Sequence, residues 1–419
     1  MTTARLADKP LLILISTGPQ RYREYLFVSI LSRYRIHLIN IGAPTWECAY
    51  IVGSTEVAST DLDHVLPAAC AVAAREPVAG VLSWDEARIH QAAQVAEALG
   101  LPTSPPDAVW RCRDKLASRQ ALGAAGVPQP RFEIVSSAEE ALAAAARIGF
   151  PVVIKPRAAA ASYGVVLVRN AADLHAQFGF TAVATVPHMP RYDHGVLVEE
   201  YLPGPEISVD CAVRAGRVTP LFIARKEVGF PPYFEETAHV VTHEDPLLRD
   251  QALASVLERT HAALGFTDGW THTELKLTSA GPKVIEVNGR LGGDLIPYLG
   301  MRASGIDPGL VAAAIACGQK PDMTARHALV AAVRFFYVEH DDTVIESVGF
   351  DEEALPAEID QAVSLAQPGT VVSPPPRGLV SGRIAFTTVV AGTAQRCRAA
   401  LDEARAALSV TQASSPAAR

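Results

Sequence analysis

Short, largely apolar runs alternate with amphipathic stretches over roughly the first 110 residues. The runs at residues 11–16, 36–41 and 80–83 are typical of strands buried in a parallel sheet. The stretches after the first and third runs are long enough for helices that end near Ser32 and Leu99. This alternation predicts a doubly wound α/β domain. No G-x-G-x-x-G motif follows the first run, so we expect no dinucleotide site there.

The pattern changes after residue 112. Residues 115–126 and 138–148 have helical end signals, a glycine after the first and an N-cap serine before the second. Two strand-like runs around a loop of small residues complete a compact α+β unit, and longer strands follow from residue 196. The predicted divisions are an N-terminal α/β domain, a small lid subdomain, a C-terminal antiparallel-sheet domain and a frayed tail, over residues 1–112, 113–195, 196–409 and 410–419.

Two apolar, β-branched runs each carry one glutamate, Glu274 in the first and Glu286 in the second, with turn-forming residues between them. Side chains alternate along a strand, so the two carboxylates lie directly opposite if the hairpin centres on Ala280. Carboxylates on a buried strand need a cation, and together with the amide oxygen of Asn288 they suit Mg²⁺. The alternative is a surface hairpin with a solvated glutamate on each arm.

Composition restricts the class of partner. The 419-residue chain is 49% hydrophobic and 20% charged, as in folded globular proteins. Its net charge of −8 and pI near 5.9 argue against nucleic acid or an anionic membrane as a partner. The sequence has no run of about 18 apolar residues, and its start lacks the features of a signal peptide. Six scattered cysteines without metal-binding spacing indicate reduced thiols, so we expect a cytoplasmic protein.

Two segments are candidates for nucleotide contacts. Lys155 ends an apolar strand and precedes a loop of mostly small residues, including Ser162 and Gly164, which suits a cover over phosphates. The loop is not a P-loop, because the lysine comes before it, and an ordinary loop is the alternative. The second segment, residues 196–206, is an apolar strand that ends in paired acids and an aromatic residue. It could face an adenine edge, with Glu206 at the ribose, or could be an ordinary strand end before a Pro-Gly turn.

The order of these segments resembles the ATP-grasp superfamily, and within it the carboxylate–amine ligases that make dipeptides from free amino acids. The resemblance covers nearly the whole chain and is most specific in the last motif. The motifs that carry it are Ser83-Trp84-Asp85-Glu86, Arg113-Asp114-Lys115, Ile154-Lys155-Pro156, Glu199 to Leu202, and Ile285-Glu286-Val287-Asn288 with Arg290. The chain has Ala159 and Ala161 where relatives tend to have glycines, which predicts a stiffer lid.

The resemblance implies ATP and Mg²⁺ as cofactors, with two metal ions and Mn²⁺ as an alternative metal. The residues that it implies at the nucleotide are Lys115 and Lys155 at the phosphates, Ser162 and Gly164 in the lid, Glu199, Glu200, Tyr201 and Leu202 around the adenine, and Glu206 at the ribose. The implied metal ligands are Glu274, Glu286 and Asn288. Catalytic roles are implied for Lys155, Arg290 and His239, with Arg290 stabilising an acyl phosphate.

Residues 234–239 resemble a substrate-loop motif of the amino-acid ligases. By this resemblance Glu236 recognises an amino group, and His239 lies near the attacking amine or the acyl phosphate. A neutral His239 could there accept a proton from the incoming ammonium. The alternatives are a surface pair of Glu235 and Glu236 and a structural or solvated His239. Further along the chain, Asp294 either caps the next helix or lines the acyl-substrate pocket. Lys226 either reaches the nucleotide or is solvated.

These features predict an ADP-forming ligase that activates a carboxylate as an acyl phosphate and joins it to an amine, making a dipeptide or an amino-acid amide. The predicted partners are small-molecule carboxylates and amines, in the first place amino acids, and the family implies a homodimer. A carboxylase or a thioester-forming ligase is the second hypothesis. A nucleotide-binding regulator without catalysis is the third, and the complete set of Glu274, Glu286, Asn288 and Arg290 argues against it.

Overall fold

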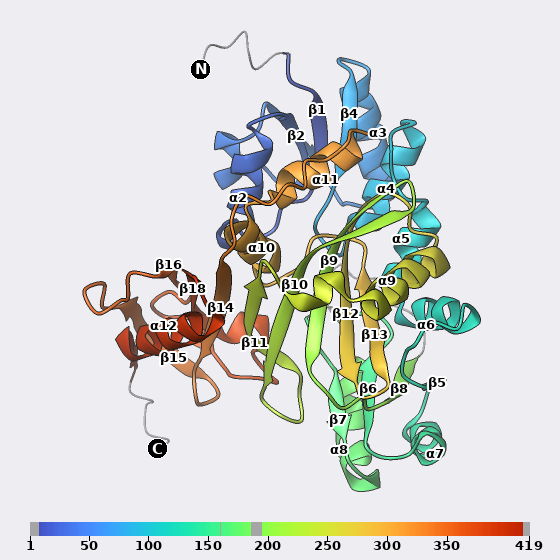
Figure 1. Ribbon diagram of the computed structural model, residues 1–419, viewed down its shortest axis with the longest axis vertical. Coiled ribbons are helices and arrows are strands. Elements are labelled where there is room, and N and C mark those ends of the chain that lie inside the picture. The colour runs from blue at the N-terminus through green and yellow to red at the C-terminus, as the bar shows by residue number, and fades with distance from the viewer. Residues whose placement is uncertain (1–7, 160, 186–194, 414–419) are drawn as a thin grey trace.

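The computed structural model describes residues 8–159, 161–185 and 195–413. At the top of Figure 1, a four-stranded parallel sheet in the order β3-β2-β1-β4 confirms the predicted α/β fold of the N-terminal part. Its elements are β1 (Leu11–Ile15), α2 (Gln20–Ile30), β2 (Arg35–Ile41), β3 (Gly53–Val57), α3 (Leu62–Ala73), β4 (Val78–Leu82) and α4 (Ile89–Ala98), with the 3₁₀ turn η1 (Trp46–Ala49). The sequence pattern did not predict β3, because this edge strand is mostly polar and half exposed.

A small four-stranded antiparallel sheet, in the order β5-β8-β6-β7, lies at the bottom of Figure 1. The elements of this region are α5 (Pro106–Arg113), α6 (Lys115–Ala124), β5 (Phe132–Val135), α7 (Ala138–Ile148), β6 (Val152–Pro156), β7 (Val166–Val168), α8 (Ala171–Val183) and β8 (Val196–Glu200). Ser137 caps α7 as predicted, by accepting from the Glu140 amide. The predicted boundary at residue 196 assigned β8 to the C-terminal domain, but β8 pairs with β5 and β6. The prediction failed because the apolar run of β8 suits a strand of either sheet.

An eight-stranded sheet forms the centre of the molecule, in the order β13-β12-β9-β10-β11-β14-β18-β16. Its strands are β9 (Glu206–Arg214), β10 (Arg217–Gly229), β11 (Glu235–Thr242), β12 (Gly269–Thr278), β13 (Gly281–Asn288), β14 (Val330–Tyr337), β16 (Ile359–Ser364) and β18 (Arg383–Ala391). The helices of this part are α9 (Gln251–Leu264), α10 (Ile296–Ser304), α11 (Pro308–Ala316) and α12 (Ala394–Ala407), with 3₁₀ turns η2 (Pro246–Arg249) and η3 (Val380–Gly382). All pairings within this sheet are antiparallel, as predicted.

The chain ends in a third, three-stranded sheet in the order β17-β15-β19. Its strands are β15 (Thr343–Phe350), β17 (Val371–Val372) and β19 (Leu408–Gln412). The prediction of a frayed tail from residue 410 was therefore wrong for residues 410–412, which pair with β15. Short polar segments near a terminus give little local signal for strand pairing. The rest of the predicted tail, residues 414–419, lies outside the described residues.

One hydrophobic core joins the N-terminal sheet to the large sheet. It contains Leu12, Phe27 and Trp84 from the N-terminal part together with Phe222 and Trp270 from the large sheet. In Figure 1, α10 and α11 lie between these two parts. The cores of the two parts are therefore continuous across their boundary.

Helix α11 packs closely on the N-terminal sheet through β4 and on α2. A methyl group added at Gly80 of β4 would lie 2.6 Å from the carbonyl oxygen of Ala316 in α11. Glycine is therefore required for this approach of helix to strand.

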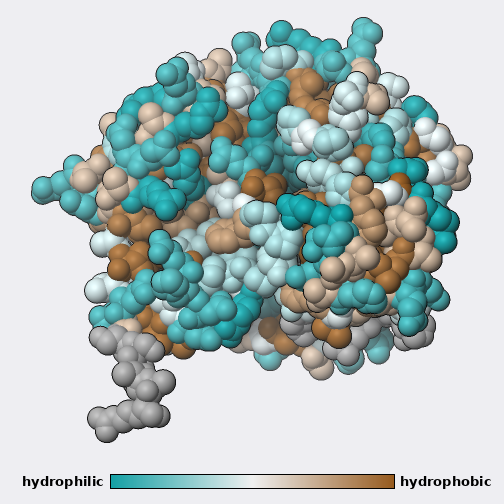
Figure 2. Space-filling view, turned by 90° about the horizontal axis from the view of Figure 1, so that it is seen from below, coloured by the Kyte–Doolittle hydropathy of each residue, from teal (hydrophilic) through white to brown (hydrophobic). Residues whose placement is uncertain are grey.

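Hydrophobic side chains on the face shown in Figure 2 lie in scattered groups among hydrophilic ones. Within the described part of the chain, no helix combines the length and apolar character needed to cross a bilayer.

Candidate active site

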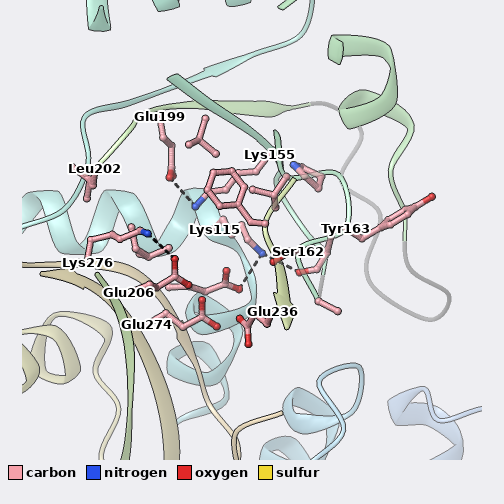
Figure 3. Close-up of a pocket in the computed structure, with 18 of the residues that line it drawn as sticks. Lys115, Lys155, Ser162, Tyr163, Glu199, Leu202, Glu206, Glu236, Glu274 and Lys276 are labelled. Carbon is pink, nitrogen blue, oxygen red and sulfur yellow. Dashed lines mark hydrogen bonds and ion pairs between the residues drawn. The ribbon is translucent and has the colours of Figure 1, made fainter. Parts of the chain in front are cut away.

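A cavity with an empty volume of about 930 Å³ collects most of the predicted site residues. In Figure 3, Lys115 and Lys155 lie across the cavity from Glu206, Glu236 and Glu274. The predicted residues that line it are Lys115, Lys155, Ser162, Glu199, Glu200, Tyr201, Leu202, Glu206, Glu236, Glu274, Glu286, Asn288 and Arg290.

The hairpin of β12 and β13 places Glu274 directly opposite Glu286, as predicted. The route to this register differs from the prediction. A two-residue turn centres the hairpin between Ser279 and Ala280, half a residue before the predicted centre. A β-bulge that contains Ile285 adds one residue to β13 and restores the alignment of the two carboxylates.

Strand register brings further polar residues onto the same face of the large sheet. Residues that pair across neighbouring strands share a face. The pairs next to the two carboxylates are His272 with Asn288, Lys276 with Glu206, and Lys226 with His239. Five strands, β9 to β13, therefore supply one continuous polar surface under the cavity.

The two predicted lysines are buried and reach this surface from the other side of the cavity. Lys115 Nζ lies 3.0 Å from Glu286 Oε1 and also donates to the Ala159 carbonyl oxygen at 3.0 Å. Lys155 Nζ lies 2.8 Å from Glu199 Oε2. Burial lowers the pKa of Lys155, and the Glu199 carboxylate opposes this effect. Two desolvated ammonium groups in one cavity attract an anionic ligand strongly.

Glu199 has a side-chain role that the sequence did not predict. Its carboxylate is buried between Lys155 and Arg119, whose Nε donates to it at 2.7 Å. Burial alone would raise the pKa of Glu199, but these two cations outweigh it and lower the pKa to about 2. A basic residue four positions after Lys115, on the same face of a helix, was the available signal for Arg119.

Glu199→Gln is expected to lower the free energy of unfolding by about 3–5 kcal/mol, because it leaves two buried cations without their anion. The folded pKa of Glu199 lies below its ordinary value of 4.5, so its contribution is present above pH 4.5. The difference between wild type and variant should shrink as the pH falls from 4.5 towards 2. Urea unfolding across this range measures it, and a difference independent of pH would contradict the assignment.

The loop of small residues covers the two lysines. Ala161 and Ser162 adopt the left-handed conformation, with φ of 55° and 54°, which costs an alanine about 1 kcal/mol or more relative to glycine. Ser162 lines the cavity as predicted. Gly164 was predicted in the lid with Ser162, but it is buried behind the loop, where its carbonyl oxygen accepts from Thr181 Oγ1 at 2.9 Å. The predicted loop residue Ala160 lies outside the described residues.

Gly164→Ala is expected to destabilise the protein through two effects. Gly164 has a φ of 77°, and an added Cβ would lie 2.4 Å from the Cβ of Ala184. The matched control is Gly216→Ala, which has a φ of 73° and no atom within 4 Å of the added Cβ. Both variants carry the left-handed cost, and Gly164→Ala alone carries about 1–3 kcal/mol of overpacking. Equal urea midpoints for the two variants would contradict this account of Gly164.

Lys226 is buried at the centre of three carboxylates, which neither sequence reading of this residue predicted. Its Nζ lies 2.6 Å from Glu236, 3.3 Å from Glu274 and 3.6 Å from Glu206. Burial favours a lower pKa for Lys226, but the three carboxylates raise it well above its ordinary value. The signal in the sequence was a lysine just after the apolar run of residues 221–224, where a charged group that is buried needs partners.

A second cavity, with an empty volume of about 600 Å³, shares Ser162, Glu236, Glu274 and Arg290 with the first. The Nε of Arg290 lies 2.5 Å from Glu86 Oε2 of the N-terminal part. The sequence motif containing Glu86 therefore has a structural explanation, because this carboxylate orients the predicted catalytic arginine.

Asp294 lines the second cavity and does not cap α10, whose first turn has no side-chain cap. Its carboxylate accepts two hydrogen bonds from Arg383, at 2.6 and 2.9 Å. Arg383 is buried, pairs also with Glu235 and stacks over the Phe335 ring at 3.8 Å. Sequence analysis missed Arg383, although an arginine that opens an apolar strand requires buried acids.

His239 is fully buried beneath this cavity. Its Nε2 lies 3.2 Å from Glu236 Oε2 and 3.6 Å from Asp294 Oδ2. Burial favours the neutral ring, but Asp294 and Glu236 raise the pKa of His239. The prediction required a neutral imidazole, whereas these two carboxylates favour the protonated form.

The residues around the first cavity fit a nucleotide and a divalent cation in their chemistry. Val153, Leu202 and Ile285 supply apolar walls. Tyr201 and Leu202 follow the last ladder pair of β8, so the sheet does not use their backbone groups. Glu206 faces Lys276 at 3.0 Å. Glu274 and Glu286 face each other beside Asn288, an oxygen donor set that suits Mg²⁺. Oxygen atoms of Glu206, Glu236 and Glu274 also lie within 4.8 Å of one another, but the Lys226 ammonium already lies among them.

Comparison with known proteins agrees with this geometry. Residues 148–297 match the ATP-grasp domain family. The uncharacterized protein y4rH of Sinorhizobium fredii is 30% identical over 372 residues, which is 87% of this chain and 76% of that protein. Carnosine synthase 1 of Homo sapiens is 28% identical over 257 residues, 58% of this chain, and the chain spans 31% of its length. The L-amino acid ligase of Bacillus licheniformis shares the fold, with a TM-score of 0.78, 22% identity and coverage of 96% and 98%.

The chain therefore belongs to the ATP-grasp family. Within that family it is related to ATP-dependent ligases.

Proposed function

We propose that this protein is an ADP-forming ligase, which activates a carboxylate with ATP and Mg²⁺ and joins it to an amine. The observation that carries this proposal is the pair of adjoining cavities. One has the lysines and carboxylates suited to a nucleotide, and the other has a charged lining suited to small polar substrates. Arg290 lies at the junction, where the γ-phosphate would meet a carboxylate.

Lys115 and Lys155 bind the phosphates in this proposal, under the loop that contains Ser162. The adenine lies between Val153, Leu202 and Ile285, beside the backbone of residues 199–202, and Glu206 faces the ribose. Glu274, Glu286 and Asn288 would hold two Mg²⁺ ions. These ions would neutralise negative charge on the phosphate groups.

In the first step a carboxylate oxygen attacks the γ-phosphorus, and the bond from this phosphorus to the bridging oxygen of ADP breaks. Two anions must approach each other, so the contribution of Lys115, Lys155 and Arg290 is positioning and charge stabilisation. In the second step the unprotonated amine attacks the acyl carbon and the bond from this carbon to the phosphate oxygen breaks. The departing phosphate takes the proton that the nitrogen loses. Water competes with the amine, so the covering loop protects the intermediate.

Glu236 and Asp294 bind the ammonium group of an amino-acid substrate. These two ionised carboxylates line the second cavity, and each lies close to His239 Nε2. Because they favour the protonated imidazole, we assign His239 to charge stabilisation rather than to proton removal. The names carnosine synthase and L-amino acid ligase support an amino acid as substrate and a dipeptide or an amide as product.

The test is phosphate release from ATP and Mg²⁺ against a matrix of paired amino acids, with the nucleotide product identified by chromatography. ADP and phosphate formed with a particular pair are expected. An ¹⁸O label in the activated carboxylate should then appear in the released phosphate, because the attacking oxygen stays on phosphorus. AMP and pyrophosphate would contradict the acyl-phosphate route.

Additional reactions with bicarbonate or coenzyme A in place of the amine test for a carboxylase or a thioester-forming ligase. ATP binding without turnover in any reaction would indicate a regulator. The cytoplasmic location and the homodimer stay predictions.

A further inference from the structure

The N-terminal sheet turns its ligand-binding edge towards the second cavity. Its strand order reverses between β1 and β4, and ligands of doubly wound sheets bind outside the carboxyl ends of the strands at such a reversal. The two strand ends are linked by a hydrogen bond of 2.9 Å from Ser16 Oγ to Asp85 Oδ2. The next residue, Glu86, holds Arg290. The reversal point therefore lies beside the residues that handle substrate.

Helix α2 starts at this edge and carries Arg23. A nitrogen of Arg23 donates to the Gly292 carbonyl oxygen at 3.4 Å. Its charge interacts with those of Arg290 and Asp294, which line the second cavity, and more weakly with that of Asp85. No carboxylate among the described residues forms an ion pair with Arg23, whereas Arg290 has Glu86 and Arg383 has Asp294. Arg23 is thus a partly buried cation without an anion of its own.

Two tyrosines of α2 accompany this arginine. The hydroxyls of Tyr22 and Tyr25 are buried at this edge of the N-terminal sheet. Tyr22 lies near Arg383 and Asp294, and Tyr25 lies beside Arg23. Each hydroxyl is a hydrogen-bond donor, which suits it to contact a carboxylate bound beside Arg23.

There is room for such a ligand at this edge. A Cβ added at Gly293, which lines the second cavity, would meet no atom within 4 Å. The open space lies one residue from the carbonyl group that Arg23 contacts.

We propose that Arg23 binds the α-carboxylate of the amino acid that supplies the attacking amine, with the Tyr22 and Tyr25 hydroxyls beside it. This inference rests on the proposed function. An amino acid that reacts through its amine keeps a free carboxylate, and this anion needs a cation that is not engaged with phosphate. The guanidinium fork binds a carboxylate through two hydrogen bonds. The enzyme would therefore select free amino acids over their amides as the amine partner.

Steady-state phosphate release with the productive pair tests this role in Arg23→Gln. The KM for the amine partner should rise at least about tenfold, as expected for a lost hydrogen bond to a charged group. The KM values for ATP and for the activated carboxylate should stay within about twofold of wild type. Arg23→Lys should recover part of the loss. The matched control is Arg21→Gln, which removes an exposed arginine from the same helix.

The primary amide of the amine partner gives a second readout. Wild type should use the free acid at least about tenfold better than the amide, and Arg23→Gln should use the two about equally. An unchanged KM in Arg23→Gln, or equal use of acid and amide by wild type, would overturn the role of Arg23 while the ligase assignment stands.

Thermal unfolding with Mg²⁺ and a non-hydrolysable ATP analogue makes the test independent of turnover. Free amino acids and their amides are the probes. Wild type should be stabilised by at least one free amino acid more than by its amide, and Arg23→Gln should not. The absence of any such preference in wild type would overturn the proposal. Failure of turnover with every pair would instead contradict the proposed function.

Discussion

Glu286→Gln is expected to abolish phosphate release, which means a fall of at least about 1,000-fold, or about 4 kcal/mol of transition-state stabilisation. Glu286 faces Glu274 across the hairpin and lies 3.0 Å from Lys115. The neutral amide removes one charge from the proposed metal ligands and leaves Lys115 without its partner. Steady-state phosphate release at saturating ATP and ordinary Mg²⁺ measures the effect.

The control is Glu346→Gln, the same change at an exposed position of β15. It should leave activity unchanged. Thermal unfolding of both variants establishes that any loss of activity occurs in a folded protein. Activity of Glu286→Gln close to that of wild type would disprove the metal assignment.

Arg290→Ala should lower kcat/KM by at least about 100-fold, equivalent to about 2.7 kcal/mol, if the arginine meets charge that develops on the transferred phosphoryl group. Arg290 lies at the junction of the two cavities and is oriented by Glu86. Glu86→Gln should cause a smaller loss, because it leaves the positive charge in place and weakens only its orientation.

Arg302→Ala on α10 is the matched control, since it removes a half-exposed arginine paired with Asp360 at 2.7 Å. It should have little effect on kcat/KM, because Arg302 lines neither of the two cavities. A loss below about tenfold in Arg290→Ala, or about 1.4 kcal/mol, would show that Arg290 has a structural role only.

The sequence predicted those parts of the fold that follow from the local hydrophobic pattern and from the order of the motifs. The buried runs of β1 and β2 and the capped helix α7 were identified from local signals. The strand β8 was assigned to the wrong sheet, because an apolar run shows that a strand is buried and not which partner it takes. The strand β19 was missed, because its pairing with β15 is a contact between distant segments.

The site was predicted where residues lie close in sequence or in a recognised motif. The opposition of Glu274 and Glu286 follows from a hairpin, although a bulge was needed to produce it. The partners of Lys226 and Arg383 come from several strands, and no local pattern specifies them. A rule that every charged residue on an apolar strand needs an opposite charge would have identified both as site residues, without naming their partners.

The tight contact of α11 with β4 has a consequence for protein engineering. Gly80 permits this contact, and the core beneath it draws on both parts of the chain. A chimera that exchanges only residues 1–112 with those of a relative would cut through this shared core. A recombination that transfers α10 and α11 together with the N-terminal segment would keep the contacts of α11 with β4 and α2. The packing unit around the N-terminal sheet is therefore discontinuous in sequence, and crossover points belong on either side of α10–α11.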